Sequence, residues 1–114
     1  MLGLGEIRDY CGKKKGAVED FPFDFSTLVF KVGGKMFALM NIDADPVSIN
    51  LKCDPFLSLE LRARYPQVTP GYHMNKKHWN TLLVDGAMPD DEVLRLIDHS
   101  YELVARSPKK EAKR

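Results

Sequence analysis

The sequence predicts an α+β domain in which helices pack on one face of an antiparallel β-sheet, in the order α-βββ-α-ββ-α. Three observations lead to this prediction. The pair Gly33-Gly34 separates two runs of β-branched, aliphatic and aromatic residues, as the two-residue turn of a β-hairpin does. Residues 47–53 alternate apolar and polar side chains, which is typical of a half-buried strand. Residues 93–104 repeat apolar side chains at helical spacing.

The first half of the chain is expected to form one helix and a three-stranded meander. The helix is predicted over residues 6–15, before Gly16. Its apolar stripe consists of Leu4, Ile7, Tyr10 and Cys11. Residues 18–24 are predicted to be a loop whose residues 21–23 fill the edge of the core. The three strands are predicted at residues 25–32, 35–42 and 47–53. Residues 36–40 are apolar on both faces, which suits a strand covered on both sides or a strand with one face open to a partner.

The second half is expected to contain two helices with a hairpin between them. Asp54 and Pro55 are predicted to be the N-cap and the first residue of a helix that ends at Pro66. The apolar side chains of this helix are Phe56, Leu57, Leu59, Leu61 and Tyr65. The last helix is predicted to begin within residues 88–92, whose acids favour the positive end of the helix dipole, and to run to about Arg106.

Most of the candidate functional residues lie in the predicted hairpin at residues 70–86. We expect an outgoing arm at residues 72–74, a turn over residues 75–78 and a return strand over residues 79–84. On the return strand, Trp79, Thr81 and Leu83 would face one way, and Asn80, Leu82 and Val84 the other. The tip carries two lysines and two histidines, and such a tip can place cationic groups on a phosphate backbone.

Overall charge is balanced, with 17 Lys and Arg against 16 Asp and Glu, which argues against a bulk polycation that coats nucleic acid or membrane. The position of the charges is more informative. No acid occurs in residues 61–84, whereas acids gather at residues 19–24 and 85–92. The sequence therefore predicts a bipolar surface, and ordinary solvated charge is the alternative.

The chain is predicted to form a single domain over residues 1–107, followed by a basic flexible tail at residues 108–114. Cys11 and Cys53 are too few and too far apart for a disulfide framework or a zinc site, and suit a reduced cytoplasmic protein. The N-terminus does not resemble a signal peptide, and no apolar run approaches the roughly 18 residues of a membrane span. We expect a cytoplasmic monomer that does not contact membranes.

Several sequence segments together resemble the MmcQ/YjbR family of small bacterial proteins. These segments are GYHMNKKHWNTLLVDGAMPDDEV at residues 71–93, HSYELV at residues 99–104, VEDFPFDF at residues 18–25, and residues 50–53 leading into Asp54-Pro55. The family is described as predicted DNA-binding proteins with a double-wing motif. The resemblance implies a frataxin-like (CyaY-like) sandwich, which agrees with the order of elements above, and it implies DNA as the partner.

The candidate DNA-binding residues lie mostly in the hairpin. They are Lys76, Lys77, His73, Asn75, His78, Tyr72, Trp79, Lys35, Arg62 and Arg64. Lys76 and Lys77 are the best candidates for phosphate contacts, and the Gly33-Gly34 turn beside Lys35 would be the second wing. An exposed turn that favours polar residues is the plain alternative. Trp79 could stack on a base, but an aromatic that anchors the hairpin to the core is the stronger interpretation.

Other function classes have less support from the sequence. His73 and His78 could meet across the hairpin, yet no Cys, Asp or Glu in residues 61–84 completes a ligand set, so we expect no metal and no cofactor. No phosphate-binding Gly-rich loop, nucleophile elbow or pair of carboxylates indicates an enzyme. The main rival is a module that binds a protein or a small ligand, which an open face over residues 36–40 would favour.

Overall fold

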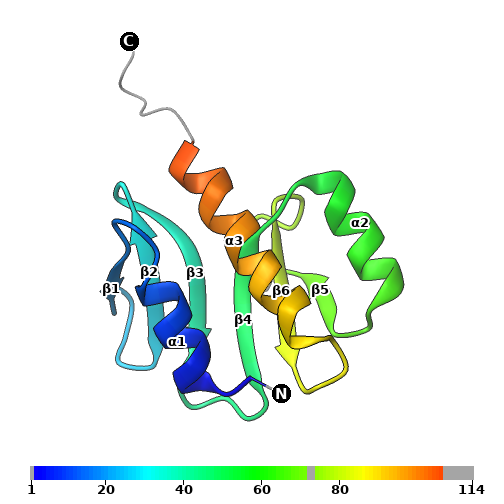
Figure 1. The fold of residues 1–114 in the computed structure, drawn as a ribbon, viewed down its shortest axis with the longest axis horizontal. Coiled ribbons are helices and arrows are strands. Elements are labelled where there is room, and N and C mark those ends of the chain that lie inside the picture. Colours follow the sequence, from blue (N-terminus) through cyan, green and yellow to red (C-terminus); the bar gives the residue numbers. More distant parts are fainter. Residues whose placement is uncertain (1, 72–73, 107–114) are drawn as a thin grey trace.

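The computed structural model describes residues 2–71 and 74–106. A six-stranded antiparallel sheet, in the order β1-β2-β3-β4-β6-β5, carries the helices on one face (Figure 1). The helices are α1 (Leu4–Gly12), α2 (Pro55–Arg64) and α3 (Asp90–Arg106). The strands are β1 (Val18–Asp20), β2 (Thr27–Val32), β3 (Lys35–Asn41), β4 (Val47–Lys52), β5 (Val68–Pro70) and β6 (Trp79–Val84). The predicted fold class and layout are confirmed.

The main core lies between the sheet and the helices. Helix α3 crosses β3 and β4, and its buried residues recur at helical spacing (Figure 1). Helix α1 contributes Ile7 and Cys11, both fully buried. The predicted alternation is confirmed on two strands, since Ile49 and Leu51 of β4 and Leu82 of β6 are buried in this core. None of the described helices has the length and apolarity that crossing a membrane would need.

A cluster of polar groups joins α1 to α3. The Tyr10 hydroxyl donates a 2.8 Å hydrogen bond to the Asp98 carboxylate, and the Lys14 ammonium pairs with the same carboxylate. The Lys14 nitrogen also lies 4.8 Å from the centroid of the Tyr10 ring. The hydrogen bond to Asp98 raises the pKa of Tyr10. These contacts fix the angle at which α1 lies against α3.

The hairpin of β2 and β3 forms as predicted. Gly33 and Gly34 have φ values of +59° and +81°, the left-handed conformation that a two-residue turn between twisted strands needs and that glycine adopts without strain. The register then shifts by one residue, because Phe30 pairs with Ala38 while Lys31 pairs with Met36. The extra residue is Phe37, which is fully buried against the helices.

The central pairing of the sheet is short. Strands β3 and β4 pair over Ala38 with Leu51, Leu39 with Asn50, and Met40 with Ile49. By contrast, β4 pairs with β6 along its whole length, from Val47–Val84 to Lys52–Trp79. The sheet is therefore two well-paired halves joined at a narrow seam, which Figure 1 shows between β3 and β4.

Two predictions about the N-terminal half were wrong. Residues 18–20, expected in a loop, form the short edge strand β1, in which Val18 pairs with Lys31. The segment 21–23 does not fill the core, because 63% of Phe23 is exposed. Strand β1 is exposed along its whole length, so its sequence shows no hydrophobic alternation. Because β1 pairs with β2 at the edge of the sheet, residues 21–23 follow it outside the core.

Helix α2 begins as predicted, but two of the five residues in its predicted apolar stripe do not pack. The Asp54 carboxylate accepts hydrogen bonds from the backbone N–H groups of Phe56 and Leu57, both 3.0 Å long. Leu61 is buried, whereas Phe56 and Leu59 are 83% and 63% exposed. The helix covers β5 at the end of the sheet rather than its centre, so only a narrow stripe is buried.

Replacing the N-cap of α2 tests the capping contact. We expect Asp54→Ala to lower the free energy of unfolding by about 1 kcal/mol, because two N–H groups of the first helical turn lose their acceptor. Asp54→Asn, which keeps an acceptor oxygen, should lose much less. Urea unfolding followed by circular dichroism measures both, and equal losses would contradict the assignment of this cap.

Candidate functional site

The antiparallel register places both predicted wing tips at the same end of the sheet. Strand β3 begins at Lys35, β4 ends at Lys52 and β6 begins at Trp79, and the pairing of β3 with β4 and of β4 with β6 aligns these three strand ends. The Gly33-Gly34 turn and the turn over residues 75–78 therefore flank the end of β4. We call this end of the molecule the basic end.

The opposite end of the sheet carries acids. One strand length of about 20 Å separates the two ends. The side chains on the segments at that far end include Asp24, Asp43, Asp45, Asp85, Asp90, Asp91 and Glu92. These acids lie at the end of the strands opposite the two tips.

The turn over residues 75–78 forms as predicted and is held by Asn75. The side-chain oxygen of Asn75 accepts hydrogen bonds from the backbone N–H groups of Lys77, at 3.0 Å, and His78, at 3.3 Å. Its backbone oxygen accepts from Trp79 N–H at 2.9 Å. An Asx turn of this kind presents the two lysine side chains outward without relying on a glycine.

The described strand that pairs with β6 is β5, where Pro70 pairs with Asn80. The arm predicted at residues 72–74 falls mostly outside the described residues. Proline suits this position because β5 is an edge strand. Tyr72 and His73 lie outside the described residues. A side chain at Gly71 would approach Trp79 Cβ to 2.8 Å, so the chain passes close to the base of the turn there.

Arg62, which was predicted to contact DNA, holds the turn in place. Its Nε donates to Asn80 Oδ1 at 2.8 Å, and its Nη2 donates to the backbone oxygens of Lys76 at 2.6 Å and Trp79 at 3.4 Å. The guanidinium thus links α2 to both sides of the turn. Arg64 is the last residue of α2, and its guanidinium lies 5.7 Å from the ring centroid of Tyr65.

The lysines at the basic end differ in their surroundings. The Lys76 ammonium donates to the Gly71 backbone oxygen at 3.1 Å, and Lys77 is exposed. Within the described residues, neither forms an ion pair with a carboxylate. Lys35 is half-buried at the other tip, whereas Lys31 lies 3.6 Å from the Asp20 carboxylate. The positive charge of the turn over residues 75–78 is therefore available to an anion.

Lys52 also lies at the basic end, and sequence reasoning did not select it. It ends β4, directly opposite Trp79 and between the two tips. Because Ile49 and Leu51 face the main core, the alternation of the strand turns Lys52 to the opposite face of the sheet. A signal existed in the sequence, since Lys52 is one of the polar residues in the alternating segment 47–53, but its place beside the tips depends on a pairing between distant strands.

Trp79 is a structural residue of the hairpin. Only 9% of it is exposed, and it packs with Val29 and Leu39 in a small cluster on the sheet face opposite the helices. Met36 and Met74 cover this cluster from the sides. The core interpretation of Trp79 fits this burial, whereas a base stacked on its ring would have to displace the methionines.

The remaining histidines and the cysteines occupy structural positions. His99 Nε2 accepts a 3.1 Å hydrogen bond from Asp54 N–H, and His78 is half-buried at the turn. Nowhere in residues 2–71 and 74–106 do three His, Cys, Asp or Glu side chains gather as a metal site would require. Burial raises the pKa of Cys11 to about 12 and also raises the pKa of Cys53, so both are neutral thiols at pH 7.

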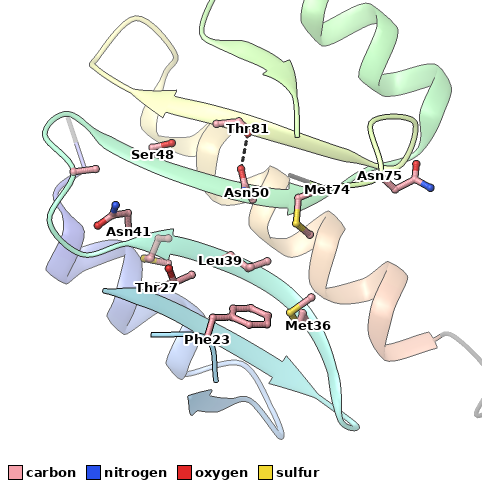
Figure 2. A pocket seen from close by; sticks show the side chains of 12 residues that line it. Phe23, Thr27, Met36, Leu39, Asn41, Ser48, Asn50, Met74, Asn75 and Thr81 are labelled. Atoms are coloured by element: carbon pink, nitrogen blue, oxygen red, sulfur yellow. Dashed lines mark hydrogen bonds between the residues drawn. The ribbon is translucent and has the colours of Figure 1, made fainter. Parts of the chain in front are cut away.

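A groove of about 880 Å³ opens on the sheet face that the helices leave uncovered (Figure 2). It lies over the seam between β3 and β4, and Figure 2 shows side chains from both halves of the sheet turned toward it. Among the residues that the structure describes, its lining includes no ionisable side chain. The lining residues are Phe23, Thr27, Met36, Leu39, Met40, Asn41, Ala44, Ser48, Asn50, Met74, Asn75 and Thr81.

Sequence reasoning anticipated this groove only in part. The apolar character of residues 36–40 on both faces allowed for an open face, and Met36 and Leu39 do lie in the groove wall. Phe23 belongs to the segment 21–23 that was predicted to fill the edge of the core, and Asn50 is one of the polar residues in the alternating segment 47–53. These side chains come together through strand pairing between distant segments, which no local pattern encodes.

Comparison with known proteins identifies the family. A sequence model of the YjbR family matches residues 12–103. The uncharacterised protein YjbR of Escherichia coli K12 is 33% identical over 101 residues, which are 89% of this chain and 86% of that protein. The chain belongs to the YjbR family. The resemblance in the sequence is thereby confirmed.

Solved structures of similar proteins share the fold of this YjbR-family protein. Deinococcus radiodurans protein DR2400, which carries a DUF419 domain, is 42% identical, with a TM-score of 0.89 over 99% of this chain and 87% of that one. A Pseudomonas syringae protein is 32% identical, with a TM-score of 0.77 over 90% of this chain and 99% of that one. The arrangement of helices and strands is thus shared with these two proteins.

The two cysteines should be unreactive in the folded protein. Cys11 is fully buried and Cys53 is 3% exposed, and burial keeps both as thiols. We expect no reaction with Ellman's reagent at pH 8 in the native state and full reaction in guanidinium. Rapid labelling of the native protein would contradict this burial.

The raised pKa of Cys11 also makes the free energy of unfolding depend on pH. This free energy should fall as the pH rises from about 9, where the unfolded thiol ionises, toward about 12, where the folded thiol does.

Arg62 and Arg64 form a matched pair for testing the support of the turn. Arg62→Ala should lower the free energy of unfolding by about 2 kcal/mol, because it leaves the buried oxygen of Asn80 without this donor and detaches α2 from the turn. Arg64→Ala should stay within about 0.5 kcal/mol of the parent protein. Urea unfolding compares the two, and equal losses would show that the Arg62 contacts do not hold the turn.

Proposed function

We propose that this YjbR-family protein binds DNA by placing the phosphate backbone against the basic end of its sheet, with the two hairpin tips as paired contacts. The observation that supports it most is the strand register, which brings the turn over residues 75–78 and the Gly33-Gly34 turn to one end. Two cationic tips on one rigid sheet can follow a backbone together, whereas tips on opposite sides could not.

The surroundings of the lysines support the same proposal. Lys77 is exposed, and within the described residues neither Lys76 nor Lys77 is paired with a carboxylate. Two acids near this end have compensating neighbours, since Asp54 caps the positive end of α2 and Glu102 lies 3.4 Å from Arg106. These contacts reduce the repulsion that the two carboxylates exert on a phosphate at the tips.

The Asx turn and the guanidinium of Arg62 contribute by holding the turn before DNA arrives. Asn75 fixes the backbone of the lysine pair, and Arg62 ties the turn to α2. A contact surface that is already ordered loses less conformational entropy on binding than a mobile loop does. Arg62 therefore has a positioning role in this proposal, while Lys76, Lys77, Lys35 and Lys52 supply the charge.

The direct test reverses the charge of the lysine pair. In fluorescence anisotropy with a labelled duplex at low salt, Lys76→Glu with Lys77→Glu should weaken binding at least about 10-fold. The slope of log K against log salt, expected at about −2 to −4 for the parent protein, should become shallower by about 2, because two phosphate contacts are lost.

The matched control is Lys13→Glu with Arg95→Glu, which changes the net charge by the same amount away from the basic end. Lys13 pairs with Asp9 on α1, and Arg95 pairs with Asp91 on α3. This variant should bind the duplex within about threefold of the parent protein. Equal weakening by both double variants, or no weakening by the tip variant, would refute a role for the tips.

A further inference from the structure

We infer that the uncharged groove on the open face of the sheet holds an unpaired nucleobase whose phosphate lies at the basic end. The inference rests on the proposed function and makes it more specific, since the preferred ligand becomes a nucleotide of a single strand rather than a duplex. The groove volume of about 880 Å³ lies in the range of small-molecule sites, roughly 300–1,000 Å³.

The position of the groove links it to the tips. Asn75 is in its lining and directly precedes Lys76 in the turn. Lys52 ends β4 on the same face, two residues beyond Asn50. A ligand with a neutral body and an anionic end therefore matches the charge pattern, with the body in the groove and the anion against the lysines.

The walls of the groove suit a flat ring. Phe23 stands at one side, with its ring near Met36 in Figure 2, and Met74 faces it from the other half of the sheet. Aromatic and thioether side chains are polarisable, and they offer the kind of surface on which a base stacks. Phe23 is 63% exposed, so its ring is available to a ligand.

The polar groups of the groove favour a base rich in carbonyl oxygens. Asn50 Oδ1 accepts a 2.6 Å hydrogen bond from the Thr81 hydroxyl (Figure 2), and Asn41 Oδ1 accepts one at 2.9 Å from the backbone N–H of Asp43. Each of these bonds uses one of the two lone pairs of an amide oxygen. Among the residues that the structure describes, none accepts a hydrogen bond from either amide nitrogen, so the two amides offer N–H donors to a ligand. Thymine offers two carbonyl oxygens to these N–H donors, whereas adenine offers ring nitrogens as acceptors together with an N6 amino group that is itself a donor.

The test compares labelled oligothymidylate, labelled oligoadenylate and a labelled duplex by fluorescence anisotropy at one low salt concentration. Oligothymidylate should bind about 10-fold more tightly than the duplex and more tightly than oligoadenylate. Phe23→Ala should weaken oligothymidylate binding about 10-fold, because one stacking surface is lost, and should leave duplex binding unchanged.

Phe25→Ala is the matched control, since Phe25 is 95% exposed, lies two residues away and is not in the groove lining. It should leave all three affinities unchanged. Asn50→Leu should remove the preference for oligothymidylate over oligoadenylate, because the amide donor is gone. Thymidine monophosphate, titrated alone, separates the two sources of a nucleotide: binding comparable to that of the oligomer assigns the groove to free nucleotides, and much weaker binding assigns it to a strand.

The outcomes separate this inference from the proposed function. If the duplex binds through Lys76 and Lys77 but the oligomers bind no more tightly, and Phe23→Ala has no effect, the base-binding inference is wrong and the proposed function stands. If thymidine monophosphate binds in a manner that depends on Phe23 while no DNA binds, the groove inference stands for free nucleotides and the proposed function is wrong. If no nucleotide or DNA binds, both are wrong.

Discussion

The short pairing of β3 with β4 is the constraint on which the rest of the arrangement depends. It covers three residue pairs, from Ala38–Leu51 to Met40–Ile49, and it is the sole pairing that the described residues provide between the two halves of the sheet. Because this pairing is antiparallel, the start of β3 and the end of β4 meet at one end, and β6 brings its own start to the same place. The seam also lies beneath the uncovered groove.

The hairpin of β5 and β6 depends on contacts from outside its own strands. β5 is three residues long, and a short two-stranded hairpin is at best marginally stable by itself. Arg62 supplies hydrogen bonds from α2, and Trp79 packs against Val29 and Leu39 on the opposite face. The lysine turn is thus held from both faces of the sheet, which is what a preformed contact surface requires.

Local sequence signals were sufficient for much of the fold. Glycines at 33 and 34 gave the hairpin, Asp54 gave the start of α2, and alternation in β4 and β6 gave the faces of both strands. Each of these depends on residues near one another in the chain. The extra strand β1 and the position of β5 were missed, because neither strand shows alternation and each exists through pairing with a neighbour.

The candidate site was less accessible to sequence reasoning for the same physical reason. Lysines 76 and 77 stood out because they lie in an acid-free segment, and they are indeed at the tip of the turn. Arg62 lies in the same segment, but its side chain is used in the structure of the turn. The groove needs Phe23, Met36, Asn50 and Met74 side by side, and only the tertiary fold brings them together.

The central claim is that the two tips and the mouth of the groove form one nucleic-acid surface, and amide chemical shifts measured by NMR during titration with a short DNA strand test it most directly. The account predicts that the largest shifts occur at Lys35, Lys52 and residues 75–78, with small shifts around Asp43 and Asp90 at the other end of the sheet. Largest shifts on the outer faces of α1 and α3, with none at the lysine turn, would contradict it.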